Sequence, residues 1–350
     1  MKVVVDNSIL KFKELIPHLS DLKDIDFYHL HTEEIINNSI KDAEILFVRS
    51  TLKINADLIN NTKIKFVGSA TAGFDHIDVK YLENNNINWC YSPGCNSSSV
   101  VHYVISSINF LIEKKLFNLN DCVGIVGYGN IGSKLRKALN KVGIKNICYD
   151  PFLKLEHLKN FDEIKQCKLL SFHVPLTIGT AFPTKNIINE SLIKDFKNKI
   201  IINTSRGDIA DESSIIRDTN LIYISDVWQN EPCPFKEIIN RSLLSTPHIA
   251  GYSYDGRING TITLFKKLFQ HLNFSHEKQK INTTIIKDFL NKKEINHYPQ
   301  RISEFASAFD ILKESKNFKR ISKEYEKSLP ANIYKKIRLE HPSRRDILPD

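Results

Sequence analysis

Short apolar runs alternate with longer polar stretches along most of the chain. Residues 3–5, 45–48 and 65–68 have the pattern of buried strands, and residues 8–19 and 78–84 have that of helices. A second series of apolar runs follows, at residues 123–126, 144–149, 169–172, 199–202 and 221–225. Because strands that alternate with helices form parallel sheets covered by helices, the pattern predicts an α/β fold with two doubly wound parallel-sheet domains.

Two longer stretches with helical spacing join these series. Residues 100–112 place apolar side chains on a broad side, which predicts a helix buried between two packed units. Residues 255–272 predict another long helix, which returns toward the first series. We therefore expect residues 1–95 and 252–280 to form one discontinuous domain, with residues 96–251 inserted in it as the second.

The chain changes character after about residue 280, where lysine, glutamate and asparagine become more frequent. Residues 305–313 and 317–329 have the pattern of amphipathic helices, so residues 281–350 are expected to form a small helical C-terminal tail. Two interpretations of this tail stay open: a dimerisation element, or a solvated appendage. In the first case, Arg344 or Arg345 would reach the site of a partner subunit.

The most informative local pattern is the series GYGNIG at residues 127–132, directly after an apolar run. In a strand–turn–helix unit, Gly127 permits the tight turn and Gly129 lets the backbone approach a pyrophosphate. Gly132 lets the helix pack against the strand. The series therefore predicts a dinucleotide-binding, Rossmann-like unit rather than a glycine-rich turn without a ligand.

Two neighbouring features support this interpretation. Asn130 and Ile131 would begin the helix, whose free N–H groups and positive dipole end attract phosphate. Asp150 ends the next apolar run, about 18 residues after Gly132, near the roughly 20 expected for a ribose-binding acid. A carboxylate there repels a 2′-phosphate and favours NAD over NADP, although Lys154 nearby argues weakly for the opposite.

Bulk composition adds limits rather than a function. Hydrophobic residues make up 41% and charged residues 25%, an ordinary globular balance. The net charge of +9 suits an anionic small molecule, because no basic stripe with interleaved aromatic residues predicts nucleic-acid binding. No membrane-spanning run, signal-peptide pattern, C-x-x-C pair or metal-ligand motif is found, so we expect a cytoplasmic protein with reduced thiols and no metal.

Three residues that follow predicted strands of the second series carry candidate chemistry: Arg206, Glu231 and His248. Ligands of open parallel sheets bind beyond the carboxyl ends of the strands, where these side chains can converge. A guanidinium clamps a carboxylate, an imidazole exchanges a proton near neutral pH, and a carboxylate orients that imidazole. Each would singly be an ordinary loop residue, but their order behind a dinucleotide turn favours oxidation of a 2-hydroxy acid with hydride transfer to a nicotinamide.

These motifs resemble the D-2-hydroxyacid dehydrogenase family, and within it the branch that oxidises 4-phospho-D-erythronate. The likeness runs from about residue 3 to residue 269. The matching segments are Phe47–Ser50, Lys65–Gly73, Pro93–Asn96, Val123–Gly127, Ile201–Asn203, Asp226–Trp228 and His248–Tyr252. The glycine series and the Arg–Glu–His order are shared with the whole family, whereas the ATAG, PGCN and HIAGY segments point to the branch.

The resemblance implies roles for residues of this chain. The catalytic set would be Arg206, Glu231 and His248, with His248 as proton donor and acceptor. NAD would contact the glycine turn together with Asp150, Val174, Thr204, Asp226 and Gly251, and the substrate would contact Ser50, Thr71 and Tyr252. The first domain would bind substrate, the inserted domain would bind NAD, and the protein would be a homodimer that oxidises 4-phospho-D-erythronate to 2-oxo-3-hydroxy-4-phosphobutanoate in pyridoxal 5′-phosphate biosynthesis.

Several alternatives stay open. The substrate would instead be 3-phosphoglycerate or a simpler 2-hydroxy acid, or the chain would be a non-catalytic NAD-sensing protein on the same fold. Arg49 is a candidate for the substrate phosphate, and a structural ion pair explains it equally well. The tail matches the dimerisation region of the branch only faintly, and His102 stands where these enzymes often carry a glutamate.

Overall fold

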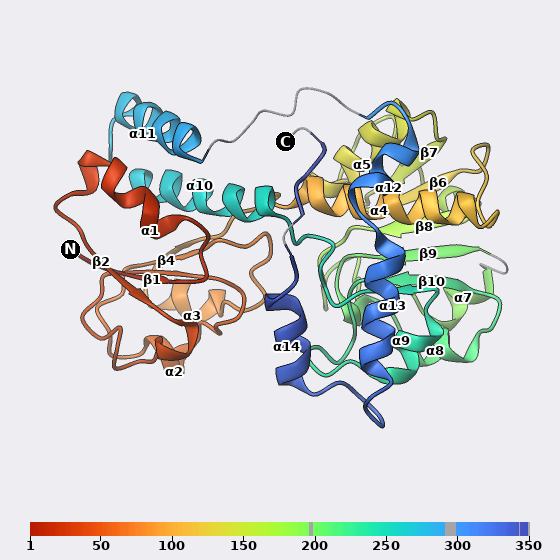
Figure 1. Cartoon of the computed structure of the whole chain (residues 1–350), viewed down its shortest axis with the longest axis horizontal. Helices are drawn as coiled ribbons and strands as arrows, with labels where there is room; N and C mark the ends of the chain where they lie inside the picture. The colour runs from red at the N-terminus through yellow and green to blue at the C-terminus, as the bar shows by residue number, and fades with distance from the viewer. Residues whose placement is uncertain (196–198, 291–298, 343, 349–350) are drawn as a thin grey trace. The chain divides into compact units, whose positions relative to one another are not determined.

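The computed structural model describes residues 1–195, 199–290, 299–342 and 344–348 (Figure 1). The chain forms two units, Met1–Asn96 with Ser253–Glu294, and Ser97–Tyr252 with Ile295–Asp350. None of the helices in these described ranges has the length and apolar character that crossing a membrane requires. The six cysteines carry free thiols.

The first unit is a five-stranded parallel sheet in the order β2-β1-β3-β4-β5, covered by helices on both faces (Figure 1). Its elements are β1 (Lys2–Asp6), α1 (Phe12–Leu15), β2 (Asp26–Leu30), β3 (Ile45–Val48), α2 (Ala56–Ile59), β4 (Phe66–Ser69), α3 (Val79–Asn84), β5 (Asn88–Cys90), α10 (Tyr254–His271) and α11 (His276–Phe289). Alternate side chains of each strand enter opposite cores: Phe47 packs with Phe12 and Phe265, whereas Leu46 packs with Leu58.

The second unit is a six-stranded parallel sheet in the order β11-β10-β9-β8-β6-β7. Its strands are β6 (Val123–Val126), β7 (Asn146–Tyr149), β8 (Leu169–Phe172), β9 (Ile200–Asn203), β10 (Ile222–Ser225) and β11 (Leu244–Ser245). Its helices are α4 (Ser97–Glu113), α5 (Asn130–Lys141), α6 (Phe161–Ile164), α7 (Glu190–Asp195), α8 (Glu212–Arg217), α9 (Lys236–Arg241), α12 (Ile302–Ala308), α13 (Ile311–Ser322) and α14 (Ala331–Leu339). The strand order reverses between β6 and β8, where open sheets of this kind bind ligands.

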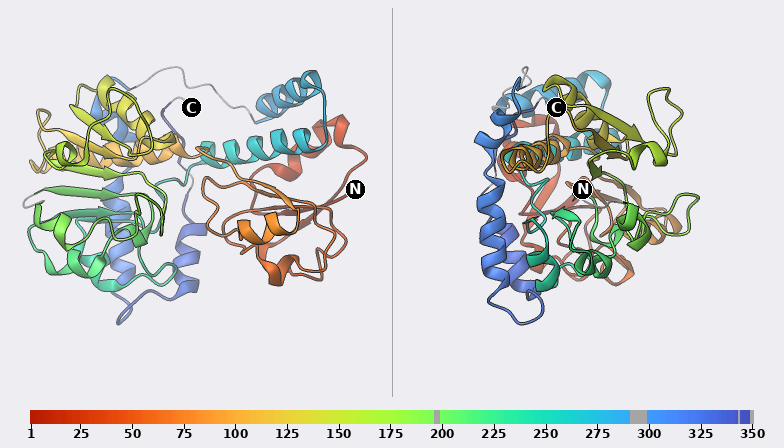
Figure 2. Two further views of the ribbon diagram at one scale, coloured as in Figure 1. Left: turned by 180° about the vertical axis from the view of Figure 1, so that it is seen from behind. Right: turned by 90° about the vertical axis from the view of Figure 1, so that its right-hand side faces the viewer.

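The C-terminal helices α12 and α13 pack against the second unit itself. They contact α4, and α13 also contacts β11 and α9 (Figures 1 and 2). Phe305 of α12 and Ile311 of α13 enter the core on the α4 face, and Phe318 of α13 enters the core on the opposite face of the sheet. Together with α5, α12 buries α4 along nearly its whole length.

The predicted fold class is confirmed: both sheets are parallel and doubly wound, and the C-terminal region is helical. The residues beyond 280 are divided, because α11 belongs to the first unit and α12–α14 to the second. The sequence of α11 is rich in lysine, and its apolar face is short. On that face Ile286 is buried, and Asn282 donates to Asp21 at 3.0 Å. Helix bounds also differ from those predicted in the tail, at Ile302–Ala308 and Ile311–Ser322.

The helix predicted at residues 8–19 is wrong. The structure has the four-residue α1 followed by 3₁₀ turns at Ile16–His18 and Ser20–Leu22. Lys11 takes φ +63° just before α1, and Pro17 lies in the first 3₁₀ turn, where it cannot continue an α-helix.

Candidate active site

The turn between β6 and α5 has the backbone that its glycines require. Gly127 has φ +95°, and a Cβ there would come within 2.3 Å of the carbonyl oxygen of His173. A Cβ at Gly132 would come within 2.0 Å of the carbonyl oxygen of Gly127, so only glycine lets α5 lie this close to β6. A Cβ at Gly129 would meet nothing within 4 Å, so this side of the turn has room for a ligand.

The N-terminus of α5 offers donors to an anion. The helix begins at Asn130, and no side chain caps it at Gly129. The first N–H groups of a helix lack an intrahelical partner and lie at the positive end of its dipole. Asn130 and Ile131, the first two residues of α5, therefore fit the pyrophosphate of a dinucleotide.

Asp150 lies directly after β7, on the same edge of the sheet as the glycine turn. Its Oδ2 accepts the N–H of Tyr128 at 2.9 Å, and its Oδ1 accepts the N–H of Phe152 at 3.1 Å. The first contact ties the acid to the glycine turn. Each carboxylate oxygen keeps a further lone pair, so Asp150 has the capacity to accept hydrogen bonds from ribose hydroxyls, and that contact stays a prediction.

Val174 and Thr204 lie on the other side of the strand-order reversal, after β8 and β9. The N–H of Val174 donates to Ser205 Oγ at 3.1 Å, and Thr204 Oγ1 lies 3.4 Å from Nδ1 of His173. These contacts join the β8 and β9 loops at the carboxyl edge of the sheet. Both predicted cofactor residues therefore lie where the fold binds ligands.

Arg206 is the third residue after β9, on a loop that approaches the loop after β10 very closely. A Cβ at Gly207 would lie 1.9 Å from the carbonyl oxygen of Trp228, so glycine is required at this crossing. The guanidinium of Arg206 donates to the carbonyl oxygen of Ser205 at 2.8 Å. The structure thus places Arg206 on the loop beside the one that carries Glu231.

Glu231 and His248 form a hydrogen-bonded pair across two loops. His248 Nδ1 lies 2.7 Å from Glu231 Oε2, and Glu231 Oε1 accepts the N–H of Trp228 at 2.9 Å. The side chain of His248 is 33% exposed and that of Glu231 is 22% exposed, so the pair is partly shielded from solvent and still accessible. Because Nδ1 contacts the carboxylate, Nε2 is the ring nitrogen that can exchange a proton with a substrate.

The charge state of Glu231 suits this pairing. Burial acts to raise the pKa of its carboxyl group, but the charge and hydrogen bond of His248 outweigh it, helped by Arg338 and the N–H of Trp228. The pKa of Glu231 is therefore lowered, and the group is a carboxylate at neutral pH. Such a carboxylate orients the imidazole and stabilises its charged form.

Asp226 holds the segment that carries His248. Its carboxylate accepts Thr246 Oγ1 at 2.6 Å and the N–H groups of Ile249 and Ala250 at 2.7 and 2.8 Å. His248 itself has φ +58°, a left-handed conformation that residues other than glycine seldom adopt. Asp226 is 1% exposed, and burial raises its pKa. Both of its carboxylate oxygens accept hydrogen bonds within the protein, and its predicted contact with the cofactor stays a prediction.

Glu212 is a residue of the site region that the sequence analysis missed. Its carboxylate is 4% exposed and accepts the N–H of Gln229 at 2.9 Å, which holds the turn leading to Glu231. Burial raises the pKa of Glu212 to about 7, against the Gln229 hydrogen bond and with help from the charge of Glu231. Nothing local in the sequence signals the burial of Glu212.

The predicted substrate residues of the first unit lie at the carboxyl edge of its sheet. Ser50 follows β3 and is exposed, with Arg49 half-buried before it. Thr71 follows β4, where its Oγ1 lies 2.6 Å from Ser69 Oγ and donates to the carbonyl oxygen of Gly73 at 2.9 Å. Their contact with substrate stays a prediction.

Gly251 and Tyr252 close the turn that follows His248. The N–H of Tyr252 donates to the carbonyl oxygen of Ile249 at 2.9 Å. The ring of Tyr252 meets His341 edge-on, with centroids 6.1 Å apart. Their cofactor and substrate roles also stay predictions.

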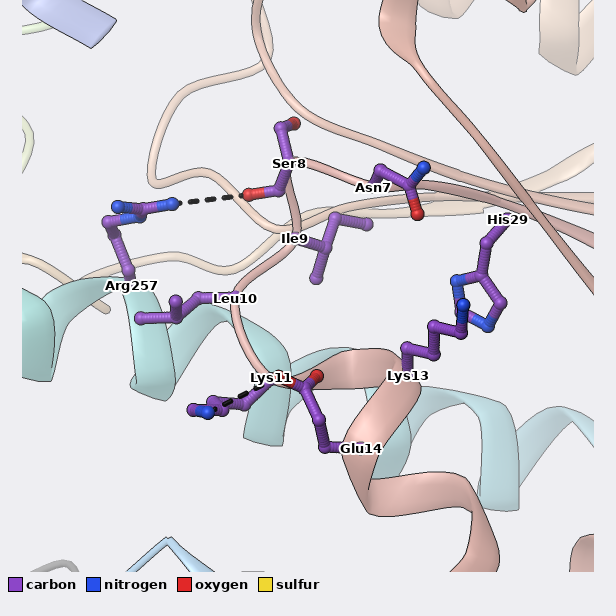
Figure 3. Close-up of a pocket in the computed structure, with 9 residues that line it drawn as sticks. All are labelled: Asn7, Ser8, Ile9, Leu10, Lys11, Lys13, Glu14, His29 and Arg257. Carbon is purple, nitrogen blue, oxygen red and sulfur yellow. Dashed lines mark hydrogen bonds and ion pairs between the residues drawn. The ribbon is translucent and has the colours of Figure 1, made fainter. Parts of the chain in front are cut away.

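The first unit has a pocket of about 280 Å³ at the carboxyl end of β1 (Figure 3). Lys11, Lys13, His29 and Arg257 make its lining basic, although Lys11 pairs with Glu14 at 3.2 Å. None of the residues that line it is a predicted site residue. The pocket therefore does not change the assignment made from the sequence.

Comparisons with known proteins identify the family of the chain. Residues 115–250 match the family model of the D-isomer specific 2-hydroxyacid dehydrogenase, NAD binding domain. A protein of Wigglesworthia glossinidia brevipalpis named erythronate-4-phosphate dehydrogenase is 37% identical, over 85% of this chain and 79% of its own. One of the same name from Acinetobacter baumannii is 32% identical, over 99% of this chain and 98% of its own.

Among solved structures, NAD+-bound 3-phosphoglycerate dehydrogenase of Entamoeba histolytica is similar, with a TM-score of 0.64 and 26% identity. The match covers 85% of this chain and 99% of that one. The identity with the curated relatives extends over most of both chains. The chain therefore belongs to the erythronate-4-phosphate dehydrogenase family of the D-isomer specific 2-hydroxyacid dehydrogenases.

Proposed function

We propose that the chain oxidises 4-phospho-D-erythronate at C2 to 2-oxo-3-hydroxy-4-phosphobutanoate, in pyridoxal 5′-phosphate biosynthesis. The names of its relatives support this substrate and pathway. The observation that carries the reaction type is the 2.7 Å contact between His248 Nδ1 and Glu231 Oε2, next to the loop of Arg206. This contact lies in the same unit as a complete dinucleotide turn.

The cofactor is NAD. The matched family model is an NAD binding domain, and the residues of the turn and Asp150 fit its pyrophosphate and adenosine ribose. Bound NAD+ supplies the hydride acceptor for C2. A carboxylate at position 150 disfavours the 2′-phosphate of NADP, because the two negative charges repel each other.

Three side chains bind the substrate, transfer its proton and orient the imidazole. Arg206 holds the substrate carboxylate, because its planar guanidinium can make two parallel hydrogen bonds. His248 Nε2 takes the proton of the C2 hydroxyl, and in reverse returns it to the alkoxide. Glu231 keeps the imidazole in the tautomer with Nδ1–H and stabilises the imidazolium that forms.

Further contacts belong to the same proposal. Ser50, Thr71 and Tyr252 contact the substrate, while Thr204 and Gly251 lie along the cofactor. The protein acts in the cytoplasm as a homodimer. The positive net charge of the chain favours an anionic substrate of this class.

The test is NADH formation by the purified protein, with 4-phospho-D-erythronate compared against 3-phosphoglycerate and unphosphorylated 2-hydroxy acids. We expect the highest kcat/KM with 4-phospho-D-erythronate. In His248→Ala, kcat should fall by roughly 10²–10⁴-fold, the usual contribution of a general acid–base group. His276→Ala, at an exposed position of α11, is the matched control and should keep wild-type kinetics.

Three outcomes would contradict the proposal in different ways. A higher kcat/KM with 3-phosphoglycerate would change the substrate. Binding of NAD without turnover of any 2-hydroxy acid would indicate an NAD-sensing protein. Near-normal turnover in His248→Ala would remove that residue from its catalytic role.

A further inference from the structure

The C-terminal segment of the chain reaches the loop that carries His248. The guanidinium of Arg344 donates through Nη1 to the carbonyl oxygens of Ile249 and Tyr252, at 3.0 and 3.4 Å. Through Nη2 it donates to the carbonyl oxygens of Ser99, at 3.0 Å, and Ala250. Three of these four acceptors lie within four residues after His248. Arg344 thus contacts its own chain, which is not the contact with a partner subunit considered from the sequence.

Other contacts fix Arg344 in this position. Its guanidinium carbon lies 4.2 Å from the ring centroid of Phe309, a cation–π geometry. The next acid, Asp346, is 5% exposed and accepts Ser99 Oγ at 3.0 Å on the adjacent α4. The segment therefore has both charged and apolar attachments within the second unit.

The same peptide groups are held from two sides by opposite charges. Asp226 accepts the N–H groups of Ile249 and Ala250, while Arg344 donates to the carbonyl oxygens of these two residues. The charges of Asp226 and Arg344 attract each other across the segment. A backbone fixed through both its donors and its acceptors has little freedom to rotate.

This restraint acts next to a strained residue. His248 has φ +58°, and such a conformation persists only where the surrounding structure determines it. Nδ1 of His248 must also stay 2.7 Å from Glu231. Releasing the carbonyl oxygens of Ile249 and Ala250 would let the His248 peptide relax and turn the imidazole away from Glu231.

The tail also approaches the other member of the pair. Tyr334 of α14 is fully buried, and its ring lies 5.8 Å from the guanidinium carbon of Arg338 on the same helix. The charge of Arg338 is among the causes that lower the pKa of Glu231. The residues after 330 therefore influence both Glu231 and the segment after His248.

We propose that Arg344 is a positioning residue for catalysis, which holds the Ile249–Tyr252 backbone so that the His248 imidazole stays aligned with Glu231. The C-terminal segment thereby acts on the active site of its own chain. This role rests on the proposed catalytic function of His248. It assigns to the tail a purpose other than dimerisation alone.

The test compares Arg344→Ala and Arg344→Lys with Arg320→Ala, which removes an exposed arginine paired with Glu324 at 3.1 Å. In Arg344→Ala we expect kcat to fall by about tenfold to hundredfold, as misalignment of a reacting group does, with KM for NAD+ changed less than about twofold. Arg344→Lys should recover only part of the loss, since an ammonium cannot reach all four carbonyl oxygens. Added methylguanidinium should restore part of the activity of Arg344→Ala.

A second readout does not depend on turnover. Amide hydrogen exchange of the peptide containing Ile249 and Ala250 should become at least about tenfold faster in Arg344→Ala, while exchange in β6 and β9 stays unchanged. Absence of turnover in the wild type would reject the proposed function but leave this exchange test valid. If Arg344→Ala is unfolded, Arg344→Lys carries the same measurements. Wild-type kcat and wild-type exchange at Ile249 and Ala250 in the folded variant would overturn the role of Arg344.

Discussion

Replacing Asp226 by asparagine tests whether the buried carboxylate holds the His248 segment. One carboxylate oxygen, Oδ1, accepts the Thr246 hydroxyl and the N–H of Ile249, and the other accepts the N–H of Ala250 at 2.8 Å. An asparagine can keep the first pair of contacts through its carbonyl oxygen. Its amide NH2 would then face the N–H of Ala250, a donor against a donor.

The magnitude follows from these contacts. Neither the N–H of Ala250 nor the asparagine N–H that faces it would have an acceptor. The site is 1% exposed, and a buried unsatisfied donor costs roughly 1–3 kcal/mol. The substitution also removes a buried charge, and burial raises the pKa of Asp226, so part of the loss is offset. We expect the free energy of unfolding to fall by about 2–4 kcal/mol.

Urea unfolding measures this loss, and steady-state kinetics separates the anchoring role from the predicted cofactor contact. If Asp226 holds the His248 segment in place, Asp226→Asn should have a lower kcat and faster amide exchange at Ile249 and Ala250, with little change in the Kd for NAD. Asp24→Asn, at an exposed position, is the control and should leave stability unchanged. If Asp226→Asn unfolds within about 0.5 kcal/mol of the wild type, the hydrogen-bond reasoning is refuted.

Four further outcomes follow from the same structure. Burial raises the pKa of Glu212 to about 7, above its usual value, so the free energy of unfolding falls as pH rises to about 7. Glu212→Gln should remove this loss of about 3 kcal/mol, which urea titrations at several pH values would measure. Burial lowers the pKa of His102 to about 4, so its contribution to the free energy of unfolding is present above about pH 6.5 and lost toward pH 4. In His102→Gln, the free energy of unfolding should therefore fall by about 3 kcal/mol less over that pH range. Gly132→Ala should destabilise the fold because its Cβ meets a carbonyl oxygen at 2.0 Å, whereas Gly129→Ala should keep the melting temperature and weaken NAD binding; equal effects in thermal melts would contradict the assignment of the turn. Arg206→Lys should raise KM for the hydroxy acid or lower kcat because an ammonium cannot make the two parallel hydrogen bonds, and an unchanged kcat/KM would remove the carboxylate clamp.

The strands that the sequence analysis missed share one physical property. β2 and β5 form the two edges of the first sheet, and β11 forms an edge of the second. An edge strand is covered on fewer sides, so β2 has the mixed sequence DFYHL with no fully buried residue, and β11 has only two residues. The interior strands β3, β6 and β9 are buried throughout and gave continuous apolar runs that sequence patterns detect.

The site shows the same division. The glycine turn could be identified from sequence because its requirements are local: positive φ at Gly127 and close packing at Gly132 exclude side chains whatever surrounds them. Asp150 follows from the regular length of a strand–helix–strand unit. Arg206 and Glu231 were predicted from their places after two predicted strands, because parallel strands end at one edge of the sheet. His248 follows β11, a strand that the apolar pattern did not reveal.

Which atoms these residues contact was decided only by the tertiary structure. The carboxylates of Asp226 and Glu212 accept backbone N–H groups in the loops that carry His248 and Glu231, and no sequence pattern indicated these contacts. Arg344 reaches the loop after His248 from the far end of the chain. Such contacts join residues distant in sequence through single side chains, and they leave no periodic or local pattern because their geometry exists only after the strands and helices have packed.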